Sequence, residues 1–116
     1  MRDRPYKLFL EDIIESIRKI QGYTKGLSFE DFKNDSKTVD AVLRNLEIIG
    51  EASRSIPPET RSKYPDIPWG RMVGLRNIVS HGYFGIDLLI IWQIVATNLP
   101  EVEPRIMKII ETTRTG

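Results

Sequence analysis

The sequence has no cysteine and only one histidine, His81. The lack of cysteine excludes disulfides, iron–sulfur clusters, thiolate zinc sites and thiol nucleophiles. With a single histidine, a metal site would have to be built mainly from oxygen ligands. If the chain does chemistry, the segment around His81 is the first place to expect it, because histidine is the side chain that titrates near neutral pH.

Long apolar runs are also missing. The longest one covers residues 86–96, and Asp87 and Gln93 interrupt it. It is much shorter than the roughly 20 residues that a membrane-spanning helix needs. No apolar signal segment follows Met1, so we expect a soluble, cytoplasmic protein without a membrane partner.

The chain has no excess of charge of one sign, since 17 basic and 16 acidic residues leave a net charge of +1. Such a chain has no global electrostatic field for nucleic acid. Contact with RNA would need a local basic patch, which suits a transient encounter between enzyme and substrate better than tight binding.

The composition of the 116 residues is that of a globular protein, with 41% hydrophobic and 28% charged residues. This length predicts one domain over residues 1–116 with its own core, which oligomerisation would help to stabilise. Apolar residues recur at spacings of three and four, and no segment alternates with the period of a strand. The predicted fold class is all-α, an antiparallel bundle of four main helices plus short connecting helices.

Capping and breaking residues set the expected helix boundaries. We expect a first helix that is entered through Asp3 and Pro5 and ended by Gly22, a short connecting helix over residues 28–34, and a long helix over 36–56 that Pro57-Pro58 ends. An extended link over 64–68 should follow, in which Asp66 and Pro68 suit the cap and first turn of the next helix, and this helix should run through the segment 76–81 and end at Gly82. We then expect a fifth helix capped by Asp87 and a separate or kinked last helix after Pro100 and Pro104.

The segment 36–56 is apolar on most of its circumference. Gly50 leaves room on it for a neighbouring helix. Its charged residues follow one another at spacings of three and four and form one narrow stripe: Lys37, Asp40, Arg44, Glu47, Glu51 and Arg54. Either a second chain or a central position in the monomer would explain this pattern. Arg44, Asn45, Glu47 and Glu51 could line a cleft, but alternating charges at helical spacing are usually a solvated stripe, and we do not count them as catalytic.

The segment 76–83 reads Arg-Asn-Ile-Val-Ser-His-Gly-Tyr. Asn77 and His81 are four residues apart and share a face of a helix, whereas Arg76 reaches the same place only through its long side chain. Structural interpretations exist as well: His81 near a helix C-terminus with Arg76 in an ordinary ion pair, Asn77 as helix-surface polarity, and Tyr83 half-buried in a turn. Spacing alone leaves these alternatives open.

The pattern Arg-x4-His-x-Tyr, followed by residues 84–87, resembles the signature of HepT-type toxins of the HEPN family. The likeness extends to the segments 44–52, 67–69 and 83–87. It implies an all-α HEPN-like fold and a metal-independent endoribonuclease site, in which paired Arg-x4-His motifs face one another across a dimer cleft. In that site Arg76 and His81 would be catalytic. Apart from the resemblance, Asn77 is a candidate for a supporting residue that orients a phosphate or the His81 ring.

Cleavage of RNA without a metal also calls for more groups than one chain supplies. A base must take the proton of the 2′-hydroxyl, an acid must protonate the departing 5′-oxygen, and a cation should stabilise the phosphate. His81 can act as the acid or as the base, but one chain has only this one histidine and so cannot supply both groups from histidine. A symmetric dimer would bring two histidines and two arginines together.

The resemblance further implies a type VII toxin–antitoxin system. Its antitoxin is a minimal nucleotidyltransferase, which uses ATP and Mg²⁺ to transfer AMP onto the motif tyrosine, here Tyr83, while the toxin needs no cofactor of its own. Many relatives carry Asp where this chain has Gly82, so the basicity of His81 could differ. The alternatives are a non-catalytic helical module that binds a nucleotidyltransferase, and a helical dimer whose motif is only structural.

Overall fold

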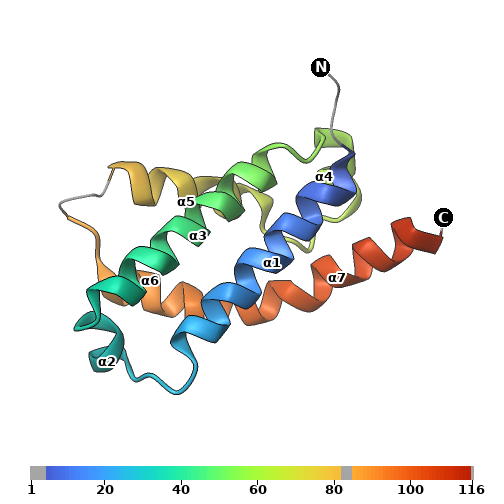
Figure 1. The fold of residues 1–116 in the computed structure, drawn as a ribbon. Coiled ribbons are helices and arrows are strands. Elements are labelled where there is room, and N and C mark those ends of the chain that lie inside the picture. The colour runs from blue at the N-terminus through green and yellow to red at the C-terminus, as the bar shows by residue number, and fades with distance from the viewer. Residues whose placement is uncertain (1–4, 82–84, 116) are drawn as a thin grey trace.

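The computed structural model describes residues 5–81 and 85–115, and it describes side chains for residues 5–79 and 85–113. Within these ranges all regular structure is helical, which confirms the predicted all-α fold. The elements are α1 (Tyr6–Thr24), α2 (Phe29–Lys33), α3 (Ser36–Arg54), α4 (Pro58–Lys63), α5 (Trp69–His81), α6 (Leu88–Gln93), the π-helix η1 (Ile94–Asn98) and α7 (Leu99–Thr115) (Figure 1).

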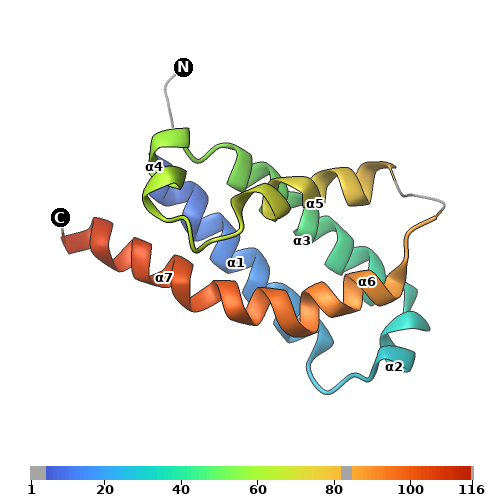
Figure 2. The ribbon, with the colours of Figure 1, turned by 180° about the vertical axis from the view of Figure 1, so that it is seen from behind.

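The long helices α1, α3, α5 and α7 form the bundle, and α3 is its central member. It packs on α1 along one side and on α5 along the other, while α7 packs on α1. Seen from the two opposite sides, α4 and the last turn of α7 lie at one end of the molecule and α2 at the other (Figures 1 and 2). The central position of α3 explains why so much of its surface is apolar, without a second chain.

The core is formed by the apolar stripes that the sequence predicts. Side chains of α1, α3 and α7 at spacings of three and four are completely or almost completely removed from solvent: Leu10, Ile13, Ile17, Ile20, Val42, Leu46, Ile49, Ile106 and Ile109. Complete burial of one such side chain contributes about 1.5–3 kcal/mol. These contacts hold α1, α3 and α7 together around one core.

The short helix α2 is more than a connector. Ser28 and Asp31 form a capping box at its start, with two hydrogen bonds of 3.1 Å. Phe32 is completely buried, and its ring centroid lies 5.2 Å from that of Trp92 on α6. The distance suits an aromatic pair, so α2, which lies at the start of α3, anchors α6.

Three predicted boundaries are wrong. The first helix does not end at Gly22 but continues to Thr24, and Gly26 makes the turn with a φ of 78° that favours glycine. The long helix expected over 36–56 ends earlier, at Arg54, and Pro58 opens the additional short helix α4, because proline is well tolerated at the first helical position. Asp66 does not cap α5, since Pro68 directly precedes that helix and its carbonyl accepts the bond from the Met72 N–H.

The junction between α6 and α7 also differs from the prediction. Asp87 caps α6 as expected, with its carboxylate accepting hydrogen bonds from the backbone N–H groups of Leu89 and Ile90. The chain then passes through the π-turns of η1 straight into α7, and both prolines lie within α7. Pro104 removes one helical hydrogen bond, but buried Val102 and Ile106 on either side hold the helix to the core.

Within the described ranges, no helix is long and apolar enough to cross a membrane.

Candidate active site

The helix α5 carries the motif, and its first turn fixes it to the bundle. Trp69 is buried, and its indole Nε1 donates a hydrogen bond of 3.1 Å to the carbonyl of Tyr64. Met72 and Leu75 are also buried, and α5 then runs unbroken to His81. The predicted helix through the motif is therefore confirmed up to that residue.

The helices α3 and α5 approach most closely at Gly50. A Cβ atom on Gly50 would lie 2.8 Å from the backbone nitrogen of Arg76, 3.1 Å from its Cβ and 3.3 Å from the carbonyl oxygen of Met72. Any side chain at this position would collide with backbone atoms, so only glycine permits the approach. The room for a neighbouring helix that the sequence predicts at Gly50 is thus taken by α5, at the residue that begins the motif.

Arg76 is paired with Glu51, the residue after Gly50. The Nε atom of Arg76 lies 3.3 Å from a carboxylate oxygen of Glu51, and the two side chains are 44% and 56% exposed. Solvent screens an ion pair with this exposure, so it adds little to stability. The pair instead fixes a guanidinium group at the surface, where an anion can reach it.

The other predicted site residues are described only in part. Asn77 is exposed on α5, so it lies at the surface next to Arg76 and is not part of the core. The backbone of His81 forms the last residue of α5, but its side chain lies outside the described residues, as does the whole of Tyr83. Convergence of Arg76, Asn77 and His81 at one point stays a prediction.

Of the four residues considered for the cleft on α3, Glu51 forms an ion pair with Arg76, the first residue of the motif. Arg44 and Glu47 form an exposed ion pair of 3.3 Å with one another, as expected for a solvated stripe. Asn45 is buried, and its amide donates a hydrogen bond of 2.9 Å to the carbonyl of Ala41. Its Oδ1 atom is buried and has no hydrogen-bond partner among the described residues, so Asn45 is not part of the solvated stripe.

The face of α5 that turns away from α3 lines an open groove of about 570 Å³, whose other wall is η1 and α7. Its floor is apolar and includes Leu75, Ile78 and Val102, while Arg71 and Glu101 are among the charged residues at its sides. Ile78 remains 40% exposed, and Leu89 and Ile90 on α6 are each 48% exposed. Ile78 lines the groove, whereas Leu89 and Ile90 do not, and all three expose apolar surface that the described residues leave uncovered.

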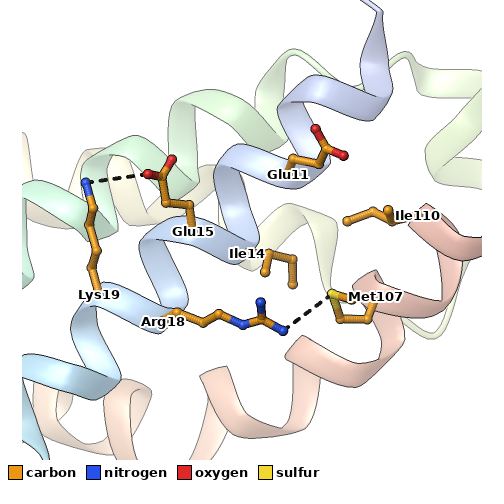
Figure 3. Close-up of a pocket in the computed structure, with 7 residues that line it drawn as sticks. All are labelled: Glu11, Ile14, Glu15, Arg18, Lys19, Met107 and Ile110. Atoms are coloured by element: carbon orange, nitrogen blue, oxygen red, sulfur yellow. Dashed lines mark hydrogen bonds and ion pairs between the residues drawn. The ribbon is translucent and has the colours of Figure 1, made fainter.

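A second depression, of about 530 Å³, lies between α1 and α7 (Figure 3). Two of its charged residues form ion pairs: Lys19 lies 3.8 Å from Glu15, which also lines the depression, and the Arg18 Nε lies 3.1 Å from Glu103 beside it. It contains no residue of the motif. Among the described residues, no three His, Asp or Glu side chains lie close enough together to hold a metal ion.

Comparison with known proteins assigns a family to this architecture. The model of a family described as "Ribonuclease HepT-like" matches residues 13–109, a range that includes α3, α5 and the whole motif. This confirms the resemblance seen in the sequence. Among solved structures, none matches the chain significantly.

Several named proteins are similar to the chain over nearly its whole length. A protein of Methanocaldococcus jannaschii, provisionally named as an RNase, is 45% identical over 106 residues, which cover 91% of this chain and 97% of that protein. The probable ribonuclease HepT of Thermococcus cleftensis is 42% identical, with coverages of 91% and 96%. A provisionally named RNase of Caldanaerobacter subterraneus is 39% identical, with coverages of 93% and 94%.

Proposed function

This chain belongs to the HepT-like ribonuclease family, and we propose that it is an endoribonuclease that cleaves RNA at the segment around Arg76 and His81. The observation that carries the proposal is the accessible guanidinium of Arg76, held at the surface of α5 within the range that the family model matches. Relatives named as ribonucleases support it.

In the proposed reaction the 2′-oxygen of one nucleotide attacks the adjacent phosphorus while a base removes its proton. The bond from phosphorus to the 5′-oxygen breaks, and an acid protonates that oxygen. His81 is the proposed acid or base, because imidazole exchanges protons near neutral pH. Arg76 stabilises the charge that develops on the phosphate, and Asn77 orients the phosphate or the His81 ring. No metal or other cofactor takes part in this proposal.

The site is proposed to be shared by two copies of the chain, because one copy has a single histidine. The half-exposed apolar side chains of Ile78 on α5 and of Leu89 and Ile90 on α6 support association with a second copy, since burial of apolar surface drives association. A two-fold axis would bring both α5 helices, and both copies of the motif, to one cleft.

We further propose that the protein is the toxin of a type VII toxin–antitoxin system. Its partner is a minimal nucleotidyltransferase antitoxin, which uses ATP and Mg²⁺ to attach AMP to Tyr83 and so stops RNA cleavage. Family membership supports this proposal.

The test is cleavage of total RNA by the purified protein in the presence of a chelator, with Arg76→Ala protein as the control. Cleavage by the wild-type protein and none by the variant is the expected result. Equal cleavage by both would place the reaction elsewhere. If neither cleaves but the wild-type protein binds a nucleotidyltransferase, the chain is a binding module and the ribonuclease proposal is wrong.

A further inference from the structure

We propose that Glu51 is a positioning residue for Arg76, an inference that rests on the ribonuclease function proposed above. A carboxylate oxygen of Glu51 lies 3.3 Å from the Nε atom of the guanidinium, which makes the two an ion pair. Within residues 5–79 and 85–113 Glu51 is the one ion-pair partner of this guanidinium, and it contacts only Nε. As far as these residues are concerned, Nη1 and Nη2 are therefore available to a phosphate group. Arginine presents its donors as a rigid planar fork, and fixing one edge therefore fixes the direction of the others.

The backbone makes this contact reproducible. At Gly50 the helix α3 lies so close to the backbone of Arg76 that there is no room for a Cβ atom. Glu51 is the next residue on the same helix. The backbone segments that carry the carboxylate and the guanidinium are therefore packed directly against each other. Without such close backbone packing, the side-chain entropy lost on pairing would largely offset the gain from an exposed ion pair, and the pair would be poorly ordered.

A positioned arginine matters most in the transition state, where its donors must match the oxygens of the phosphate. Without Glu51 the guanidinium would keep its charge but lose its direction. Removal of the carboxylate also removes a negative charge next to the RNA backbone, so substrate binding should not weaken. The expected signature is a lower kcat with a KM that is unchanged or lower.

The test compares Glu51→Gln with Glu47→Gln. Glu47 is the matched control, because it lies one turn away on the same helix and forms an ion pair of the same 3.3 Å length with Arg44. We expect Glu51→Gln to lower kcat by about 10- to 100-fold, the usual cost of removing a residue that orients a functional group. Glu47→Gln should leave both kcat and KM unchanged.

A double-mutant cycle with Arg76→Lys tests whether Glu51 acts through Arg76. Lysine keeps the charge but not the fork, so Glu51→Gln should cost nothing further in the Arg76→Lys protein. Full additivity of the two losses would overturn the inference. So would loss of the acidic limb of the pH–rate profile in Glu51→Gln, because Glu51 would then take a proton itself.

A measurement without RNA separates this inference from the proposed function. The NMR signal of the Arg76 Nε–H group should shift, and its hydrogen exchange accelerate, in Glu51→Gln but not in Glu47→Gln. An unchanged signal would overturn the positioning role. An inactive wild-type protein would overturn the proposed function and this role with it, whereas an active Glu51→Gln protein with unchanged kcat would overturn this role alone.

Discussion

Gly50 on α3 lies so close to Arg76 on α5 that a Cβ atom added to the glycine would stand 2.8 Å from the backbone nitrogen of the arginine. The neighbouring atoms are backbone, so they can yield only if a helix moves. We expect Gly50→Ala to lower the free energy of unfolding by about 1–3 kcal/mol, the usual cost of overpacking. RNA cleavage should fall as well, because α5 carries Arg76.

The control for this prediction is Gly22→Ala on α1, where an added Cβ would meet no atom within 4 Å. Alanine inside a helix is more favourable than glycine by up to about 1 kcal/mol, so this variant should be as stable as the wild-type protein or more so. Urea unfolding followed by circular dichroism measures both variants. A Gly50→Ala protein of wild-type stability would show that the close approach of α3 and α5 does not constrain the fold.

Substitution of the motif residues should remove activity without unfolding the protein. His81→Ala and Arg76→Ala are each expected to lower the rate of RNA cleavage by about 10²–10⁴, the range for loss of an acid–base group. Because the Arg76–Glu51 pair is half-exposed, its loss should change the free energy of unfolding by no more than about 1 kcal/mol. Single-turnover kinetics and thermal unfolding provide the two measurements, and collapse of the helical signal in His81→Ala would favour a structural role for this histidine.

Acid should weaken the start of α3 through Asp35. The Thr38 hydroxyl and, second, the Thr38 backbone N–H donate hydrogen bonds to the Asp35 carboxylate and hold its pKa below the ordinary value. A pKa lowered by folding means that the stabilisation is complete above the unfolded pKa of about 3.9. It is then lost as the pH falls through the lower pKa of the folded state.

Asp35→Asn is the control, because asparagine also caps a helix but does not titrate. Urea midpoints measured from neutral to strongly acidic pH should fall more steeply for the wild-type protein than for this variant. Identical acid dependence of the two proteins would mean that the cap contributes nothing through its charge.

The sequence predicts most of the helices because their apolar stripes and caps are local signals. The stripe of α1 and the Asp87 cap of α6 both appear where expected. The prediction that the first helix ends at Gly22 is wrong because a glycine destabilises a helix by only about 1 kcal/mol. Burial of the apolar side chains of α1 stabilises the helix by more than this. Pro104 misleads for the same reason, since buried neighbours compensate for one lost hydrogen bond.

The candidate site is less accessible to sequence reasoning. The motif identifies Arg76 and Asn77, and both lie at the surface of α5. The sequence places Glu51 in the solvated stripe of α3, because Glu47 and Glu51 look alike there. What separates them is the register between α3 and α5, which the contact at Gly50 sets. The adjacent glycine was the one signal in the sequence that pointed to it.

The protein is expected to be a dimer in solution, and light scattering at micromolar concentration measures this. Leu89→Glu should dissociate the dimer and lower activity, because it places a charge on the exposed apolar surface of α6. An acid in the first turn of a helix is favourable, so α6 itself should tolerate the change. Leu8→Glu is the control, since Leu8 is an exposed leucine of α1. A monomeric wild-type protein that still cleaves RNA would contradict the shared site.

The final prediction concerns Tyr83, which lies two residues beyond the end of α5. An AMP group on its hydroxyl would bring a bulky anion to the segment that has to bind the RNA phosphate, so both repulsion and occlusion would oppose substrate entry. Incubation with the cognate nucleotidyltransferase, ATP and Mg²⁺ should therefore add AMP to Tyr83 and abolish cleavage. Tyr83→Phe protein should remain active under the same treatment, because it lacks the acceptor hydroxyl. Mass spectrometry of tryptic peptides locates the adduct, and an inactivated protein with AMP elsewhere, or with none, would show that inhibition follows another route.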